Sequence, residues 1–159
     1  MEHDFSPYWN PVFIETGSFM GDGIKSAIKA GFEEIHSIEL SKKYYNHCKK
    51  KYPNVRLYRG DSALILPCLL KTIDDCCTFW LDAHYSGGDT AKENPLPLIA
   101  ELEAILHYMR PHHIILIDDI DLIREHRNEF KDFPYTLKDV EDILSLYNIT
   151  YKDNILIAR

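Results

Sequence analysis

Acidic residues stand at or near the end of five short apolar segments in this 159-residue chain. They are Glu15, Glu39, Asp61, Asp82 and the pair Asp118-Asp119. Carboxylates gathered in one place can accept hydrogen bonds from hydroxyl groups, attract a cationic ligand or bind a divalent metal ion. Aspartate also caps helices and starts turns, which accounts structurally for some of these positions. What the acids can do together depends on the elements that position them.

The five apolar segments predict β-strands at 12–14, 35–38, 55–58, 78–81 and 113–117. Helical patterns lie between them, near 24–30, 41–51, 63–71 and 98–109. Strands that alternate with helices run parallel, and right-handed crossovers place helices on both faces of the sheet. The sequence therefore predicts a doubly wound sheet, in which ligands bind beyond the carboxyl ends of the strands. We expect the acids at that edge.

The last part of the chain breaks this alternation. Thr136 and Asp139 form a capping-box pattern that opens a helix to about residue 147. Only three residues separate the apolar segments 149–151 and 155–157, which is hairpin spacing and too short for a crossover helix. The expected fold is α/β: a doubly wound seven-stranded sheet with five parallel strands, then a helix and a terminal antiparallel hairpin. We expect it to form one domain over residues 1–159.

The segment after the first strand has the composition of a nucleotide-binding loop. Residues 15–23 read ETGSFMGDG, in which glycine permits tight turns and close approach of a ligand before the next helix begins. The spacing departs from the GxGxxG of dinucleotide sites, and no Walker Lys-Ser/Thr follows. Glu39 stands 24 residues after Glu15, close to the spacing of an acid that accepts hydrogen bonds from ribose hydroxyls. These features indicate a nucleoside ligand and give less support to a pyrophosphate.

With these residues the chain resembles the class I S-adenosylmethionine-dependent methyltransferases, and the resemblance covers residues 13–158, the terminal hairpin included. It implies S-adenosylmethionine as cofactor, with its methionine part in the loop 15–23. The residues that the resemblance assigns to the cofactor are Glu15, Thr16, Gly17, Ser18, Gly21, Glu39, Asp61, Ser62 and Asp82. Of these, Glu39 would take the ribose hydroxyls, and Asp61 with Ser62 would lie beside the adenine. Electrostatics agrees, because carboxylates favour a cationic sulfonium nucleoside.

Asp82 and the pair Asp118-Asp119 follow the fourth and fifth strands, so their carboxylates are expected to converge. Three acids together repel each other unless a divalent cation with oxygen ligands binds them or the pKa of one is raised. The arrangement resembles metal-dependent small-molecule O-methyltransferases of the macrocin and sugar type, in which acids after these two strands bind magnesium. That resemblance implies Mg²⁺ at Asp82, Asp118 and Asp119, and a sugar as a candidate acceptor.

Two catalytic candidates lie at the end of the fourth strand, Asp82 and His84. His84 is the candidate general base, because a neutral imidazole accepts a proton near pH 7. The alternative is a histidine that only bonds a backbone group. The connection 83–97 is long for a strand-to-helix loop, which predicts a lid that selects the acceptor, since no appended substrate domain is expected. His112 and His113 precede the fifth strand, so we expect a structural role for them at the opposite edge.

The net charge of −7 disfavours nucleic acid as a partner, and no stretch approaches the length of a membrane helix. Four cysteines without a CxxC pair favour a reducing compartment, so we expect a cytoplasmic protein. The expected partners are a small-molecule acceptor and, as an open alternative to the monomer, further copies of this chain in a homo-oligomer. The predicted function is methyl transfer from S-adenosylmethionine to an oxygen of a small polar acceptor. The alternatives are an NAD-dependent oxidoreductase and a non-catalytic cofactor-binding or scaffold protein.

Overall fold

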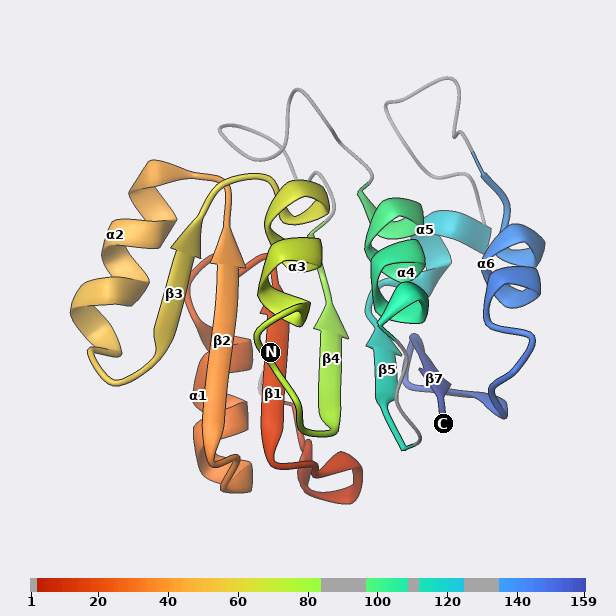
Figure 1. Cartoon of the computed structure of the whole chain (residues 1–159), viewed down its shortest axis with the longest axis horizontal. Coiled ribbons are helices and arrows are strands. Elements are labelled where there is room, and N and C mark those ends of the chain that lie inside the picture. The colour runs from red at the N-terminus through yellow and green to blue at the C-terminus, as the bar shows by residue number, and fades with distance from the viewer. Residues whose placement is uncertain (1–2, 84–96, 109–111, 125–134) are drawn as a thin grey trace.

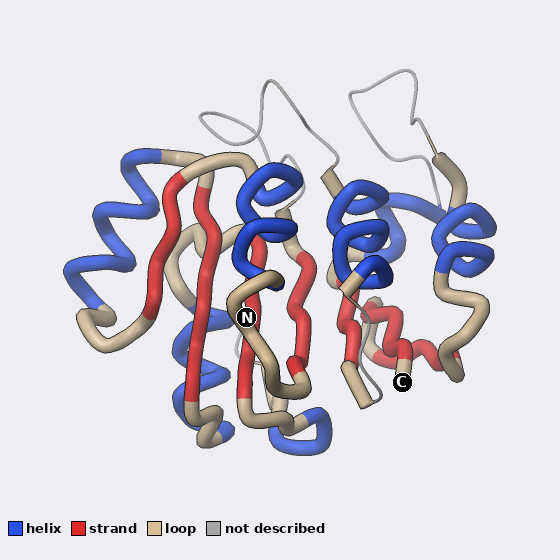
Figure 2. The backbone as a smooth tube through the Cα atoms, in the orientation of Figure 1, coloured by secondary structure: helices blue, strands red, loops and turns tan. Residues whose placement is uncertain are grey.

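The computed structural model describes residues 3–83, 97–108, 112–124 and 135–159, which form a seven-stranded sheet with helices on both faces (Figure 1 and Figure 2). The strands are β1 Val12–Thr16, β2 Glu34–Glu39, β3 Arg56–Arg59, β4 Cys77–Leu81, β5 Ile114–Ile117, β6 Ile149–Lys152 and β7 Ile155–Ala158. The helices are the 3₁₀ helix η1 Ser6–Tyr8 and the α-helices α1 Asp22–Ala30, α2 Lys42–Lys51, α3 Ser62–Leu70, α4 Leu98–His107, α5 Ile120–Arg124 and α6 Leu137–Ile143.

The strand order across the sheet is β3-β2-β1-β4-β5-β7-β6. The first five strands of the chain pair in parallel, whereas β7 is antiparallel to β5 and β6 is antiparallel to β7. The chain builds outward from β1 to β3 and then returns beside β1 with β4. This switch point places the carboxyl ends of β1, β4 and β5 next to one another, which is where open α/β sheets bind ligands. The predicted sheet and its terminal hairpin are confirmed.

The two faces of the sheet pack against different helices. Ile14 belongs to the larger core together with Leu102 of α4, whereas Phe13 belongs to a second core together with Ala27 of α1. Figure 1 shows α3 and α4 in front of the sheet and α1 behind it. Because side chains alternate along a strand, Glu15 faces the same layer as Phe13, on the α1 side.

Two of the acids lie inside strands, where the sequence predicted that they follow them. β1 extends to Thr16 and β2 to Glu39. Glu15 is opposite Ser37 of β2 and Trp80 of β4 in the parallel ladder. The prediction was wrong because a charged residue usually marks the end of a buried strand, whereas here the neighbouring strands and a serine hydroxyl surround the carboxyl group.

The helix ends also differ from the prediction in places. The capping box is confirmed, since the Thr136 hydroxyl accepts from Asp139 N and the Asp139 carboxylate accepts from Thr136 N. The helix ends at Ile143, four residues earlier than expected, because the chain continues in tight turns, with Tyr147 N donating to Leu144 O at 2.8 Å. Helix α5 and the short η1 were not predicted.

Remaining structural predictions concern a histidine and the cysteines. The buried His113 lies just before β5 and accepts a hydrogen bond at Nδ1 from Cys77 N at 2.9 Å, which confirms its structural role. All four cysteines are free thiols. Among the described residues, no helix has both the length and the apolar composition needed to cross a membrane.

Candidate functional site

A cavity of about 360 Å³ lies at the carboxyl ends of β1, β4 and β5. Its walls come from the β1–α1 loop, the residues after β4 and β5, and the β6–β7 turn. Backbone hydrogen bonds continue the ladder beyond the strand ends: Asp82 N donates to Thr16 O and Asp118 N donates to Leu81 O, both at 3.1 Å. The loops that carry the acids are therefore held at fixed positions relative to one another.

The structure brings together only part of the predicted site at this cavity. The predicted residues that line it are Glu15, Gly17, Ser18, Asp82, Asp118 and Asp119. The predicted residues that are not in its lining are Thr16, Gly21, Glu39, Asp61 and Ser62. Lining residues that the prediction missed include Phe19, Met20, Trp80, Asp153 and Asn154. Three of the candidates for the methionine part and all three candidates for the metal thus line one cavity, whereas those for the ribose and the adenine lie outside its lining.

The β1–α1 loop and the start of α1 pass too close to their neighbours for side chains at three glycines, among them Gly21, where a Cβ would collide with the Tyr52 ring. Gly17 has a φ of +85°, in the left-handed region, and a Cβ there would collide with the backbone carbonyl of Asp82. A Cβ at Gly23 would overlap the carboxyl group of Glu15. Phe19, between them, has a φ of +43° and a half-exposed side chain, an uncommon conformation for a bulky residue. The glycine spacing therefore reflects contact between this loop, the end of β4 and Glu15.

Glu15 is a buried carboxyl group at the base of the cavity. Its exposed fraction is 1%, Ser37 Oγ donates to its Oε2, and Ser18 Oγ lies 2.5 Å from Ser37 Oγ. Burial raises the pKa of Glu15 to about 8; the Ser37 hydrogen bond opposes this rise, and the charges of Asp82 and Glu39 add to it. Without a ligand the carboxyl group holds its proton at neutral pH, and a cationic ligand group would favour its ionisation.

Glu39 fastens the β1–α1 loop to the end of β2. Its Oε2 accepts a hydrogen bond from Phe19 N at 2.8 Å, and its Oε1 accepts one from Ser41 N at 2.7 Å. Burial raises the pKa of Glu39, and these backbone hydrogen bonds oppose the rise. Each carboxylate oxygen has a second lone pair that can accept from a ligand hydroxyl. Glu39 therefore orders the loop in addition to the ligand contact predicted for it.

Asp61 is the N-cap of α3, where its side chain accepts a hydrogen bond from Ala63 N at 2.9 Å. Ser62 is buried as the first residue of that helix. Helix capping therefore explains why an aspartate stands at this position, which is the structural alternative given for some of the acids in the sequence. The role of both residues beside an adenine stays a prediction.

Asp82, Asp118 and Asp119 form a compact group after β4 and β5. One carboxylate oxygen from each lies within 4.8 Å of the others, and all three residues are partly exposed. Carboxylate oxygens are the ligands that Mg²⁺ and Ca²⁺ prefer, so the donor set fits a divalent cation. His84 and nearly all of the connection 83–97 lie outside the described residues, so the general base and the lid stay predictions.

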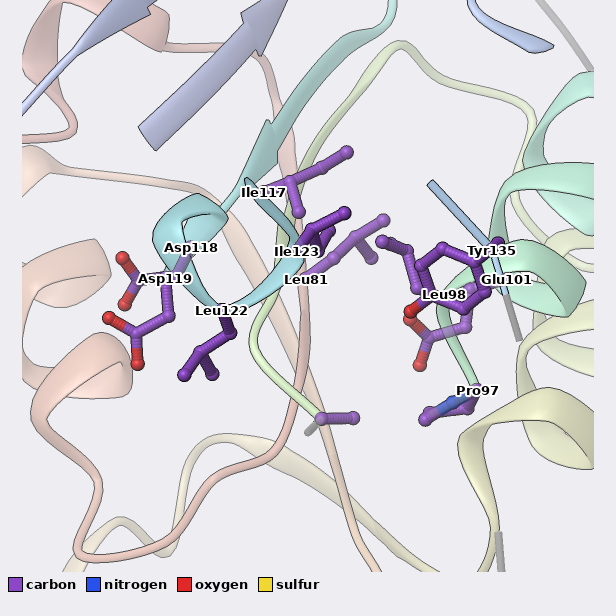
Figure 3. A pocket seen from close by; sticks show the side chains of 11 residues that line it. Leu81, Pro97, Leu98, Glu101, Ile117, Asp118, Asp119, Leu122, Ile123 and Tyr135 are labelled. Atoms are coloured by element: carbon purple, nitrogen blue, oxygen red, sulfur yellow. The ribbon is translucent and has the colours of Figure 1, made fainter. Parts of the chain in front are cut away.

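A smaller pocket of about 40 Å³ adjoins the acid pair on the side of α4 and α5 (Figure 3). Figure 3 shows Asp118 and Asp119 at one end, Glu101 and Tyr135 at the other, and apolar side chains between them. Glu101 is 1% exposed, its Oε1 has no hydrogen-bond partner among the described residues, and burial raises its pKa to about 7. Glu101 was not among the predicted site residues, although its place three residues after Leu98 puts it on the apolar face of the predicted helix.

Solved structures share the fold of this chain, although no protein-family model and no curated protein matches it. The O-methyltransferase TomG from Streptomyces achromogenes, solved with S-adenosylmethionine, is 14% identical and superposes with a TM-score of 0.69, covering 97% of this chain and 74% of its own. An O-methyltransferase from Bacillus cereus, solved with S-adenosylhomocysteine, is 12% identical with a TM-score of 0.66, covering 97% and 75%. The chain has the fold of the class I S-adenosylmethionine-dependent methyltransferases.

A third structure with this methyltransferase fold was solved with magnesium. MycE of the mycinamycin biosynthetic pathway, solved with Mg, S-adenosylhomocysteine and mycinamycin VI, is 12% identical with a TM-score of 0.62. The superposition covers 93% of this chain but only 44% of MycE. Sequence identities this low support a shared fold and no more. The roles of individual residues must therefore be argued from the geometry of this chain.

Proposed function

We propose that the chain is an S-adenosylmethionine-dependent methyltransferase that methylates an oxygen of a small polar acceptor, with a sugar as the acceptor class. The observation that carries this proposal is the carboxylate-lined cavity at the switch point of a methyltransferase fold. Its volume of about 360 Å³ lies within the range of roughly 300–1,000 Å³ that is usual for small-molecule sites. At Gly17 the loop passes so close to the backbone of Asp82 that a side chain has no room there, which places the loop directly against the end of β4.

The residues at the cavity fit the cofactor by charge and position. When bound, S-adenosylmethionine supplies an electrophilic methyl group on a positively charged sulfur. Glu15 and Thr16 at the end of β1, with Gly17, Ser18 and Gly21 of the loop that follows, would hold the methionine part. The Glu15 carboxyl group would give up its proton as it meets the cationic amino group.

The other end of the cofactor would lie along the carboxyl ends of β2 and β3. Glu39 would accept hydrogen bonds from the ribose hydroxyls while it continues to hold the loop through Phe19 N. Asp61 and Ser62, at the first turn of α3, would border the adenine. Asp82, which lines the same cavity as the loop and the acids after β5, would contact the cofactor as well as the metal.

The three acids Asp82, Asp118 and Asp119 would bind Mg²⁺ beside the acceptor. Their oxygen donors and mutual distances within 4.8 Å support this part of the proposal, as does the presence of Mg in the MycE structure. Bound magnesium lowers the pKa of a coordinated hydroxyl and fixes its direction, which suits an acceptor with neighbouring hydroxyls such as a sugar. His84, two residues after Asp82 in the sequence, would take the hydroxyl proton as general base.

Isothermal titration calorimetry tests the cofactor directly. We expect S-adenosylhomocysteine to bind with one site per chain and NAD to give no heat of binding. NAD binding without binding of S-adenosylhomocysteine would overturn the proposal in favour of an oxidoreductase.

Product analysis tests the reaction. The protein is incubated with methyl-labelled S-adenosylmethionine and a panel of sugars, with Mg²⁺ or with EDTA, and methylated products are detected by mass spectrometry. We expect a labelled methyl ether that forms with Mg²⁺ and not with EDTA. Cofactor binding without product from any sugar would contradict the acceptor class.

A further inference from the structure

The turn between β6 and β7 forms part of the cavity wall, far along the chain from the other lining residues. Its two residues, Asp153 and Asn154, both line the cavity and have φ values of +50° and +67°. The sequence pattern predicted this segment only as a hairpin connection. Asparagine and aspartate tolerate the left-handed conformation, so the backbone alone would explain the residue types. It does not explain where the side chain of Asn154 points.

Asn154 makes three hydrogen bonds to the segment that follows β5. Its Nδ2 donates to Asp119 Oδ1 at 3.3 Å, and its Oδ1 accepts from Asp121 N at 2.9 Å. Its backbone carbonyl accepts from Ile120 N at 3.1 Å. Two of the three contacts use the side chain, and all three converge on residues 119–121. The antiparallel pairing of β7 with β5 brings this turn beside the acids, 35 residues away along the chain.

Asp119 is the acid that needs such support. Its carboxyl group lies in a partly exposed wall of the cavity beside two other acids. A carboxylate next to other negative charges is driven away from them by electrostatic repulsion. An amide N–H donated to one of its oxygens restricts its rotation and compensates part of its charge, as partners of metal-binding carboxylates do.

We propose that Asn154 is a positioning residue that holds the Asp119 carboxylate in the three-acid group, so that the β6–β7 turn sets the affinity of that group for a divalent cation. The proposal rests on the metal site of the proposed function. The cation class is Mg²⁺ or a similar oxygen-seeking ion such as Mn²⁺.

Electron paramagnetic resonance with Mn²⁺ as the probe tests this without an acceptor. Free Mn²⁺ is titrated with the unsubstituted protein and with Asn154→Gly, because glycine keeps the left-handed φ of the turn and removes only the side chain. We expect the affinity for Mn²⁺ to fall about 10- to 100-fold. Binding of S-adenosylhomocysteine, measured on the same samples, should persist, which a general loss of structure would not allow. Asn154→Ala is the second variant, and Asn148→Ala, in the segment before β6 and outside the cavity lining, is the control with unchanged Mn²⁺ affinity.

A double substitution shows whether Asn154 acts through Asp119. In the Asp119→Gly background, Asn154→Gly should cost no further Mn²⁺ affinity, because the carboxylate it positions is gone. Equal Mn²⁺ affinity of the unsubstituted protein and Asn154→Gly would overturn the proposal, as would a full additional loss in the Asp119→Gly background. If the unsubstituted protein binds no Mn²⁺, the positioning role and the metal site fall together. Binding of S-adenosylhomocysteine by that same sample then reports separately on the cofactor part of the proposed function.

Discussion

Replacing Glu15 with glutamine should make the cofactor-free protein more stable at alkaline pH. Burial raises the pKa of this carboxyl group from 4.5 to about 8, whereas in the unfolded chain it ionises near 4.5. Its neutral form therefore contributes stability that is fully present below pH 4.5 and is lost as the pH rises through 8. The difference between the two pKa values corresponds to roughly 5 kcal/mol in all, at about 1.4 kcal/mol for each pH unit.

Glutamine does not ionise and keeps an oxygen that can accept from Ser37, so Glu15→Gln removes this pH dependence and little else. Urea denaturation at a series of pH values gives the free energy of unfolding of both proteins. Between pH 5 and pH 9 the unsubstituted protein should lose about 4 kcal/mol relative to the variant, because other titrating groups cancel in the difference. Two curves that run parallel across this range would refute the assignment of a buried, protonated Glu15.

Glu39→Ala should weaken binding of S-adenosylhomocysteine by about 1–3 kcal/mol in calorimetry, through lost charge-assisted hydrogen bonds; unchanged affinity would mean that the ribose is held elsewhere. Gly17→Ala should lower the free energy of unfolding by more than Gly31→Ala. Both glycines have left-handed φ values, a conformation that costs alanine about 1–2 kcal/mol. Only at Gly17 would the added methyl group also collide with the backbone of Asp82. Equal losses in urea denaturation would contradict the close passage of the loop. Asp118→Asn should abolish magnesium-stimulated methyl transfer and leave affinity for S-adenosylhomocysteine unchanged, whereas equal turnover with EDTA and with Mg²⁺ in the unsubstituted protein would exclude the metal.

Local signals in the sequence predicted most of the fold. Alternating strand and helix patterns, the capping box at Thr136 and the three-residue spacing of the hairpin are each set by neighbouring residues, and the structure confirms all three. The predicted ends of β1 and β2 were too early, because a charged residue such as Glu15 or Glu39 usually marks the end of an apolar strand. The adjacent strands and the Ser37 hydroxyl surround the first of them, which no local pattern reveals.

The missed residues depend on contacts between distant segments. Asn154 reaches the acids only because β7 pairs with β5, and a turn residue carries no local mark of that contact. Glu101 was detectable in principle, as an acid on the apolar face of a helix, but its position in the same small pocket as the acid pair, at the opposite end, follows from the packing of α4 on the sheet. The convergence of Asp82, Asp118 and Asp119 was predicted because parallel strands deliver their carboxyl ends to one edge.

A crystal structure of the protein grown with S-adenosylhomocysteine and Mg²⁺ tests the central claim most directly. The ligand should occupy the cavity beyond β1 and β4 and extend from it along the carboxyl end of β2, with its amino group at Glu15, its ribose hydroxyls at Glu39 and the metal among the three acids. Electron density for the nucleoside elsewhere, or a cavity in which Glu15 and Glu39 touch no ligand atom, would contradict the proposed methyltransferase.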